Sequence, residues 1–421
     1  MKIKVVFVVL LAAAFGSTIY ASEGPSPKGI PHLNHVFLIM MENHGYSQIV
    51  NNPNAPFINQ LARSANSATN YFAIAHPSLT NYLEVVGGSN FGVLSDNDPD
   101  WHNASCTTNL ASGVPSTDNP PTPSICPIRG TGTDAATPAT DCTNEATSPA
   151  CENNIDGIQS IPAAAHTAGK TIADQIAASG NGDRRGWKSY QESLPGSGAD
   201  RVNYSDGFYT DSTDFTTIHP TLNPALSQSD VVKLYAAKHN PFVYFRSVQQ
   251  GSDPRNSLNN IAGFGDLFSD LASGDVPAFS FIAPNQCNDQ HGRGNAGAFC
   301  NFDPISDGTQ AGLNPALIYR GDVSVQQIVA AIKGSRVWEE GRNAIIVLWD
   351  ENDYSTAPNT NQVLLIVDTN YGSHGIQSAQ PYNHFSLLKS LEAGFGLPCL
   401  NHACDDNVKV MSDLFSDHFD R

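Results

Sequence analysis

The chain has 421 residues, of which 40% are hydrophobic, enough to bury a sizeable core in one large domain or two small ones. Acidic residues outnumber basic ones by 40 to 22, which gives a formal net charge of -18. This balance argues against nucleic acid as a partner, because phosphate backbones attract Lys and Arg. It suits an acidic protein outside the cytoplasm, or carboxylates gathered around metal ions.

The first 21 residues have the pattern of a secretory signal peptide. Lys2 and Lys4 precede an apolar run over residues 5–15, and small residues lead to a predicted cleavage after Ala21. Position -3 of that site would be Ile19, so a cut a few residues away is an alternative. The apolar run is short for a bilayer, which disfavours an uncleaved anchor. We therefore expect a secreted or periplasmic protein without stable membrane insertion or an obligate protein partner.

Strands and helices alternate along the rest of the chain. The predicted strands cover residues 35–41, 187–191, 242–247, 278–283, 344–349 and 362–367. The predicted helices cover residues 56–65, 79–86, 171–178, 228–237, 324–333 and 384–394. Such alternation is typical of an α/β protein with a mostly parallel central sheet and helices on both faces. We expect residues 22–421 to form a single domain.

Residues 89–160 interrupt this alternation. They are rich in Ser, Thr, Pro and Asp and contain four of the eight cysteines, which predicts a disulfide-braced cap. The clustering of the cysteines favours the pairs 106–126, 142–151, 287–300 and 399–404, although eight cysteines allow many other pairings. A zinc site made of cysteines is less favoured, since the sequence has no Cys-x-x-Cys.

The first predicted strand ends in a carboxylate and an amide. Residues 36–41 are six apolar residues in a row, as in a strand that is buried on both faces, and Glu42 and Asn43 follow directly. In open α/β sheets, ligands and metals bind at the carboxyl ends of the strands. We therefore expect Glu42 and Asn43 to lie in a site that uses oxygen ligands.

A serine stands at the start of the predicted helix over residues 79–86. Ser78 follows His76 and Pro77, and a hydroxyl at a helix start lies beside free backbone N–H groups and the positive end of the helix dipole. Those features stabilise an alkoxide or a bound phosphate. The alternative is that Ser78 only caps the helix, because Ser is a common cap.

Two later strands also end in acidic residues. Asp289 and His291 follow the strand over 278–283, and Asp350 and Glu351 follow the strand over 344–349. Acids gathered in one cleft repel each other unless cations bind them. An Asp with a His suits a transition metal such as zinc or iron. The alternative is that each acid lies in a solvated loop. The repetition of acids after successive strands favours a site instead. His374 and His384, in later loops, are further candidates for that site.

These motifs together resemble the secreted phosphoesterase family that includes bacterial acid phosphatases and phospholipases C. That family belongs to the alkaline-phosphatase-like superfamily. The matching segments are Met-Glu-Asn-His at 41–44, His-Pro-Ser-x-x-Asn-Tyr at 76–82, Trp-Lys-x-Tyr-x-Glu at 187–192, Lys-His-Asn-Pro-Phe at 238–242, Asp-x-His-Gly at 289–292, Trp-Asp-Glu at 349–351 and His-Phe-Ser-Leu-Leu-Lys-Ser-Leu-Glu at 384–392. Each is weak alone, but their order and spacing make the set specific.

The resemblance implies a role for each candidate residue. Ser78 takes the place of the nucleophile, with Thr80 as its competitor, and Asn81 that of a phosphate-binding side chain. Catalysis is further assigned to His384, as a proton donor or ligand, and substrate binding to Asn43 and His76. The residues implied as ligands of a first metal are Glu42, Asp350 and Glu351, and those of a second metal are Asp289, His291 and His374.

The implied activity is that of a metal-dependent phosphoester hydrolase working through a phosphoserine. A small phosphomonoester is the first choice of substrate, because the chain is short and shows no appended lipid-binding module. The alternatives are a phospholipase C-type phosphodiesterase and an inactive metal- or phosphate-binding protein. Better-known two-zinc members carry Asp and His where Glu42 and Glu351 stand, so one or two divalent ions are expected, and Zn, Mg, Ca, Mn and Fe all remain open.

Overall fold

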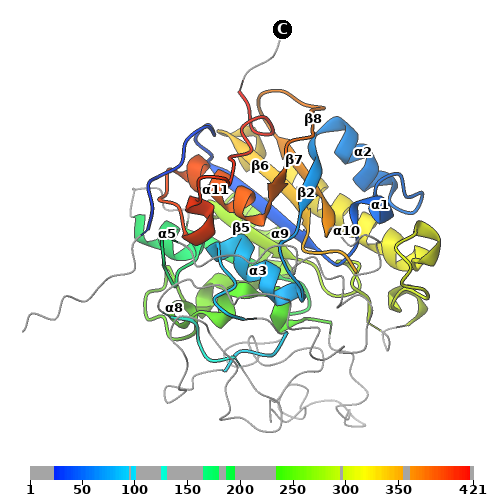
Figure 1. Cartoon of the computed structure of the whole chain (residues 1–421), viewed down its shortest axis with the longest axis horizontal. Helices are drawn as coiled ribbons and strands as arrows, with labels where there is room; N and C mark the ends of the chain where they lie inside the picture. The colour runs from blue at the N-terminus through cyan, green and yellow to red at the C-terminus, as the bar shows by residue number, and fades with distance from the viewer. Residues whose placement is uncertain are drawn as a thin grey trace, which may run out of the picture.

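The computed structural model describes residues 23–93, 96–100, 125–129, 165–179, 186–194, 234–293, 297–353 and 361–417. The predicted signal peptide and most of the predicted cap lie outside these residues. The described part is an α/β fold built around one nine-stranded sheet (Figure 1). The fold class predicted from the sequence is therefore confirmed.

The sheet is mostly parallel, with the order β4-β3-β5-β1-β6-β7-β2-β8, and β9 also pairs with β2. Only β7 runs antiparallel to its neighbours β6 and β2 among the described pairings. The strands are β1 His35–Met41, β2 Asn66–Phe72, β3 Trp187–Gln191, β4 Ile261–Gly263, β5 Phe279–Ala283, β6 Asn343–Trp349, β7 Gln362–Thr369, β8 Gln377–Ser378 and β9 Tyr382–Asn383.

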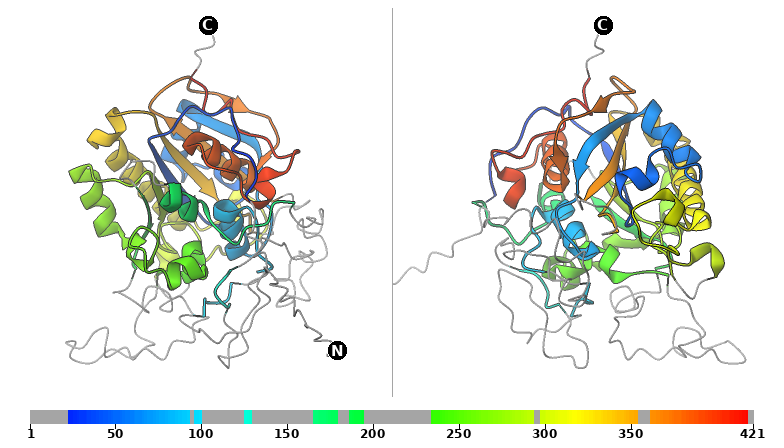
Figure 2. Two further views of the ribbon diagram at one scale, coloured as in Figure 1. Left: turned by 90° about the vertical axis from the view of Figure 1, so that its left-hand side faces the viewer. Right: turned by 45° about the vertical axis from the view of Figure 1, so that its right-hand side comes forward.

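Helices cover both faces of the sheet (Figure 2). In the views of Figure 2, α3 and α11 lie on one face, and α2 and α10 lie on the other. Because both faces are covered, every residue of the central strands β1, β5 and β6 is buried. The described helices are α1 Tyr46–Ile49, α2 Pro56–Ser64, α3 Ser78–Gly87, α5 Ile172–Ser179, α8 Arg246–Gln249, α9 Phe264–Ser273, α10 Pro315–Lys333 and α11 His384–Phe395.

The strand predicted over residues 242–247 is wrong. Those residues form the 3₁₀ helix η5, Pro241–Tyr244, and the start of α8. A short buried apolar run does not distinguish a strand from a buried helical turn, and here Pro241 opens the turn. The other five predicted strands are present, whereas β2, β4, α9 and the first half of α10 were not predicted. The helix predicted over 228–237 falls largely outside the described residues.

Two predicted disulfides are present, Cys287–Cys300 and Cys399–Cys404. The other two predicted pairs include cysteines outside the described residues. No helix among the described residues is long and apolar enough to cross a membrane.

Helix α11 buries a carboxylate, that of Glu392. Glu392 is 0% exposed, and its Oε1 accepts a hydrogen bond from the Leu400 N–H at 2.8 Å. Its Oε2 is buried without a hydrogen-bond partner among the described residues. Burial raises the pKa of Glu392 well above its ordinary value. The folded chain therefore holds this proton at pH values where the unfolded chain has released it.

We expect Glu392→Gln to flatten the fall of stability with rising pH. A raised pKa in the folded state makes stability highest below the ordinary carboxyl pKa and lowers it as pH rises toward the folded pKa. The wild type should lose about 1.4 kcal/mol of unfolding free energy per pH unit relative to the variant in that window. Denaturant titrations at a series of pH values measure this. The exposed Glu340→Gln serves as control and should follow the wild type; parallel curves for wild type and Glu392→Gln would rule the effect out.

Candidate active site

Three acidic residues meet at one edge of the sheet because three neighbouring parallel strands end there. Glu42, Asp350 and Asp289 follow β1, β6 and β5, and all three are buried. The Glu42 N–H donates to the Asp289 carbonyl oxygen at 2.9 Å, and the Asp350 N–H donates to the Met41 carbonyl oxygen at 3.0 Å. The backbone register itself thus brings these three strand-end acids together.

The Ser78 hydroxyl points into this group of acids. Helix α3 begins at Ser78, whose Oγ donates to Glu42 Oε2 at 3.0 Å and lies 3.3 Å from Glu351 Oε1. The Thr80 hydroxyl instead donates to the Val93 carbonyl oxygen at 3.2 Å. Of the two candidate nucleophiles, only Ser78 therefore shares a site with the carboxylates.

Glu351 is oriented by polar side chains that the sequence had assigned to the substrate. Its Oε2 accepts from Asn81 Nδ2 at 2.9 Å and lies 2.8 Å from His76 Nδ1. Asn81 Nδ2 also donates to the Ala75 carbonyl oxygen at 2.7 Å, so both of its N–H groups are used. In this structure Asn81 therefore holds Glu351, while its expected role as a phosphate donor stays a prediction.

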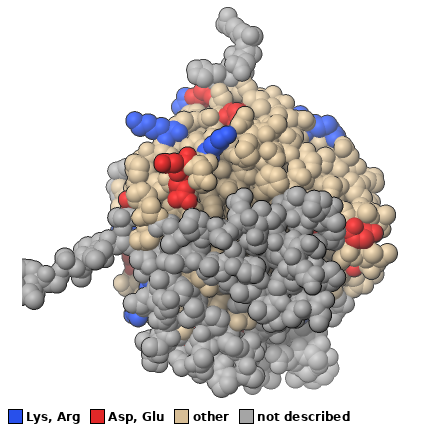
Figure 3. Space-filling model, viewed as in Figure 1, with Lys and Arg blue, Asp and Glu red and all other residues tan. Residues whose placement is uncertain are grey.

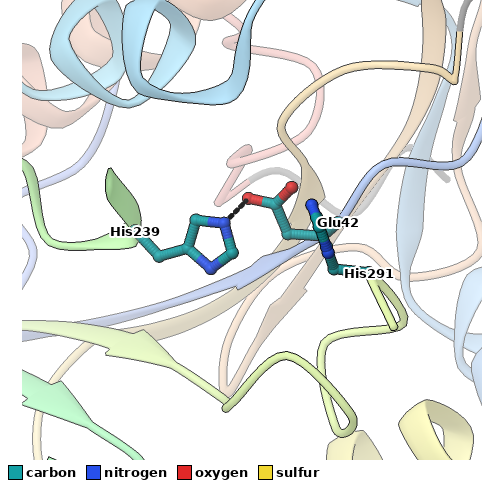
Figure 4. Close-up of side chains that lie close together, drawn as sticks. All are labelled: Glu42, His239 and His291. Carbon is teal, nitrogen blue, oxygen red and sulfur yellow. Dashed lines mark ion pairs between the residues drawn. The ribbon is translucent and has the colours of Figure 1, made fainter. Parts of the chain in front are cut away.

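His239 also belongs to this cluster; its segment at 238–242 carries part of the family resemblance, but no local pattern predicts a role for it. Figure 4 shows His239 and His291 on either side of Glu42. His239 Nε2 lies 3.0 Å from Glu42 Oε1, and its Nδ1 lies 3.3 Å from Asp289 Oδ2. Its ring stacks on Tyr82 at a centroid distance of 5.3 Å. His239 therefore bridges two of the buried acids.

This bridge sets the charges of the cluster. Burial alone would lower the pKa of His239, but the Glu42 charge and the bonds to Asp289 and Glu42 raise that pKa to about 10. Burial alone would raise the pKa of Glu42, yet the His239 imidazolium holds it well below its usual range. For Asp289, burial prevails and raises the pKa to about 6. A cationic His239 between two carboxylates follows.

His291 presents one ring nitrogen to the cluster. Its Nδ1 lies 3.0 Å from the Gly292 carbonyl oxygen, which can only accept, so Nδ1 carries the proton. Its Nε2 faces Lys238 Nζ at 3.3 Å. Burial first, and then the Lys238 charge, lower the pKa of His291 to about 4. The neutral ring thus offers its Nε2 lone pair, the form in which His binds metals.

Asp350 is the strongest sign that the cluster takes a cation. Both of its carboxylate oxygens are buried without a hydrogen-bond partner among the described residues. Burial, and then the charges of Glu42 and Glu351, raise its pKa well above the ordinary value. An unpaired buried carboxylate is costly, and a cation would offset that cost. Glu42, His239 and His291 also each have a possible ligand atom within 4.8 Å of the others, so the residues present fit a divalent metal ion, which His239 would bind only after losing a proton.

Two of the predicted histidines do not take the expected places. His384 Nε2 donates to the Asp350 carbonyl oxygen at 2.7 Å, and its Nδ1 accepts from the Tyr71 hydroxyl at 3.0 Å. Burial lowers its pKa to about 4. Both nitrogens of His384 are thus hydrogen-bonded, and the ring holds the Asp350 backbone in this structure.

His374 is exposed and lies at the wrong edge of the sheet. The next residue, Gly375, donates its N–H to the Ala65 carbonyl oxygen, just before β2 begins. Strand β2 runs in the same direction as β1 and β6, so its start lies opposite the edge that carries the acids. The structure thus does not bring His374 to the site. Asn43 follows Glu42 and is half-buried, with no side-chain hydrogen bond among the described residues.

The model of the phosphoesterase family matches residues 48–300, more than half of the chain. The chain belongs to the phosphoesterase family. One similar relative is an acid phosphatase of Aspergillus fumigatus, which is 23% identical over 89% of this chain and 58% of its own length. Another is a phosphatidylinositol-3-phosphatase of Mycobacterium tuberculosis, which is 22% identical over 97% of this chain and 92% of its own length. This chain thus spans little more than half of the Aspergillus protein. A solved alkaline phosphatase superfamily protein from Vibrio parahaemolyticus aligns over 93% of this chain and 74% of its own, with 13% identity and a TM-score of 0.42.

Proposed function

We propose that the chain is a metal-dependent phosphoester hydrolase in which Ser78 is the nucleophile. The observation that carries this proposal is the position of the Ser78 hydroxyl, at the start of α3 and within 3.3 Å of two buried carboxylates. A hydroxyl at this place has a proton acceptor on one side and the positive end of the helix dipole on the other.

The first step transfers the phosphoryl group to the protein. Ser78 gives its proton to the carboxylate group that accepts its hydrogen bond, Glu42 Oε2, as Oγ forms a bond to phosphorus and the bond from phosphorus to the leaving oxygen breaks. The low pKa of Glu42 makes this carboxylate a weak base by itself. A divalent cation held by Glu42, Asp350, Glu351, Asp289 or His291 would supply the charge that lowers the pKa of the hydroxyl and offsets the charge on the phosphoryl group.

The second step releases phosphate. A water oxygen attacks phosphorus, the bond between phosphorus and Ser78 Oγ breaks, and Oγ takes its proton back from Glu42, while both hydrogens of the water leave with the phosphate as dihydrogen phosphate. His239 and the nearby Lys238 place positive charge beside the cluster before the ester binds. Such preorganised charge is most of what phosphoryl transfer requires.

Phosphomonoesters are the proposed substrates. Both relatives described above are named as phosphatases, which supports a monoester over a phospholipase-type diester. The negative net charge, and the scattered Lys and Arg side chains on the described surface in Figure 3, fit a small phosphoester better than a nucleic acid. Two described disulfides support action in an oxidising compartment, as for a secreted or periplasmic enzyme.

We expect the purified chain to hydrolyse p-nitrophenyl phosphate at least about tenfold faster, in kcat/KM, than p-nitrophenylphosphorylcholine, a preference of about 1.4 kcal/mol. Parallel assays of the two substrates after addition of Mg²⁺, Mn²⁺, Ca²⁺ or Zn²⁺ measure this. Faster turnover of the choline diester would favour the phospholipase C alternative. No hydrolysis of either ester with any of these ions would favour the inactive binding protein.

A further inference from the structure

A carboxylate from outside the acidic cluster lies at the start of helix α3. The Leu79 N–H, one residue after the proposed nucleophile, donates to Asp96 Oδ1 at 3.0 Å. The other oxygen of this carboxylate, Asp96 Oδ2, lies 3.0 Å from Lys238 Nζ. Asp96 is thus held by a helix-terminal N–H and by an ammonium group whose side chain is only 10% exposed.

These two donors form the kind of site that binds a phosphoryl oxygen. Backbone N–H groups at a helix start bind phosphate, and a lysine ammonium adds charge-assisted hydrogen bonds. Leu79 directly follows Ser78, and Lys238 also lies 3.3 Å from His291 Nε2. The position of the Asp96 carboxylate therefore borders both the nucleophile and the proposed metal ligands. The same cluster contains the Asp350 carboxylate, whose two oxygens are buried without a hydrogen-bond partner among the described residues, and this independently favours a bound cation.

We propose that Asp96 is an internal anion that competes with the substrate for the phosphoryl position. When a phosphoester or inorganic phosphate binds, its oxygens take over the Leu79 N–H and Lys238 Nζ, and the Asp96 carboxylate is displaced. The negative charge of Asp96 then sets how tightly phosphate binds and limits inhibition by the product. This inference rests on the proposed function, because it takes the acidic cluster as the site of phosphoryl transfer.

Asp96 differs from an ordinary carboxylate cap elsewhere in the same chain. Asp322 accepts from the Ile58 N–H at 2.7 Å and from the Phe57 N–H at 3.1 Å at the start of α2. Both of its oxygens thus serve backbone donors, as a cap that only stabilises a helix would do. Asp96 gives one oxygen to the helix and the other to a lysine that contacts a proposed metal ligand, so its charge is tied to the site.

The test is the affinity for inorganic phosphate of the metal-loaded protein, measured by calorimetry. Asp96→Asn should lower the dissociation constant for phosphate about fivefold or more, and should lower KM for p-nitrophenyl phosphate in parallel. Asp96→Ser keeps a cap for the Leu79 N–H without the charge and should do the same, even if the Asn variant folds poorly. The matched control Asp322→Asn should leave the phosphate affinity unchanged.

A double-variant cycle adds a second readout. Lys238→Met should weaken phosphate binding more in the Asp96→Asn background than in the wild type, because Asp96 no longer occupies the ammonium. Unchanged or weaker phosphate binding in both Asp96 variants would overturn the inference and leave Asp96 as a cap that positions Lys238. Phosphate binding requires no turnover, so this failure is distinct from that of the proposed function, which would instead show as full activity of Ser78→Ala.

Discussion

Replacement of Ser78 by Ala is expected to lower kcat for p-nitrophenyl phosphate by at least about 10⁴-fold, as when the nucleophile of a hydrolase is removed. The hydroxyl that lies 3.0 Å from Glu42 Oε2 is the only candidate nucleophile in contact with the acids among the described residues. The substitution removes one oxygen atom from a residue that is 1% exposed, so the fold should be retained. Steady-state assays, together with a thermal unfolding curve to confirm folding, measure the effect.

Thr80→Val is the matched control for that experiment. It removes the competing hydroxyl two residues away, which donates to the Val93 carbonyl oxygen and not to a carboxylate group of the cluster. We expect kcat within about threefold of wild type and a stability loss of about 1 kcal/mol from the lost hydrogen bond. Near-normal turnover by Ser78→Ala with an inactive Thr80→Val would reverse the assignment of the nucleophile.

Asp350→Asn is expected to stabilise the metal-free protein while it removes most of the activity. The Asp350 carboxylate is buried beside two other acids without a hydrogen-bond partner among the described residues, so neutralising it should raise the unfolding free energy by about 1–3 kcal/mol in the presence of a chelator. Loss of a cation ligand should lower kcat about 10²- to 10³-fold. Such opposite effects on stability and activity are typical of functional sites.

Thermal unfolding with EDTA, and again after the metal is added back, measures this prediction. The wild type should gain stability when metal is added, because a ligand that binds only the folded state stabilises it, and Asp350→Asn should gain much less. The control Asp368→Asn removes a buried carboxylate that pairs with Lys333 away from the site, and should destabilise the protein with or without metal. A wild type indifferent to EDTA, with Asp350→Asn less stable than wild type in the chelator, would contradict the metal site.

The sequence predicted that the strand-end acids lie together at one edge of the sheet, where the structure places them, because their positions follow from local rules. Glu42, Asp289 and Asp350 each end a buried apolar strand, and parallel strands bring their carboxyl ends to one edge. Ser78 followed from a helix start, which is also a local signal. No knowledge of the pairing register was needed to group these residues, only the expectation of a parallel sheet.

The rest of the site depends on contacts between distant segments. His239 lies in a 3₁₀ helix beside a run whose pattern predicts a strand, and its bridge between Glu42 and Asp289 forms only in the folded chain. Asn81 and His384 carry polar groups suited to a substrate, but their partners turn out to be Glu351 and the Asp350 backbone. Asp96 lies in the predicted cap, where the sequence has little periodicity and therefore gave no signal.

The central claim is that Ser78 carries the phosphoryl group between the two steps. The most direct measurement is peptide mapping by mass spectrometry after the metal-loaded enzyme is mixed with p-nitrophenyl phosphate and quenched in acid, which preserves a phosphoserine ester. We predict one phosphoryl group on Ser78 in the wild type and none on the corresponding peptide of Ser78→Ala. A phosphoryl group on another residue, such as His239 or Thr80, would contradict the account.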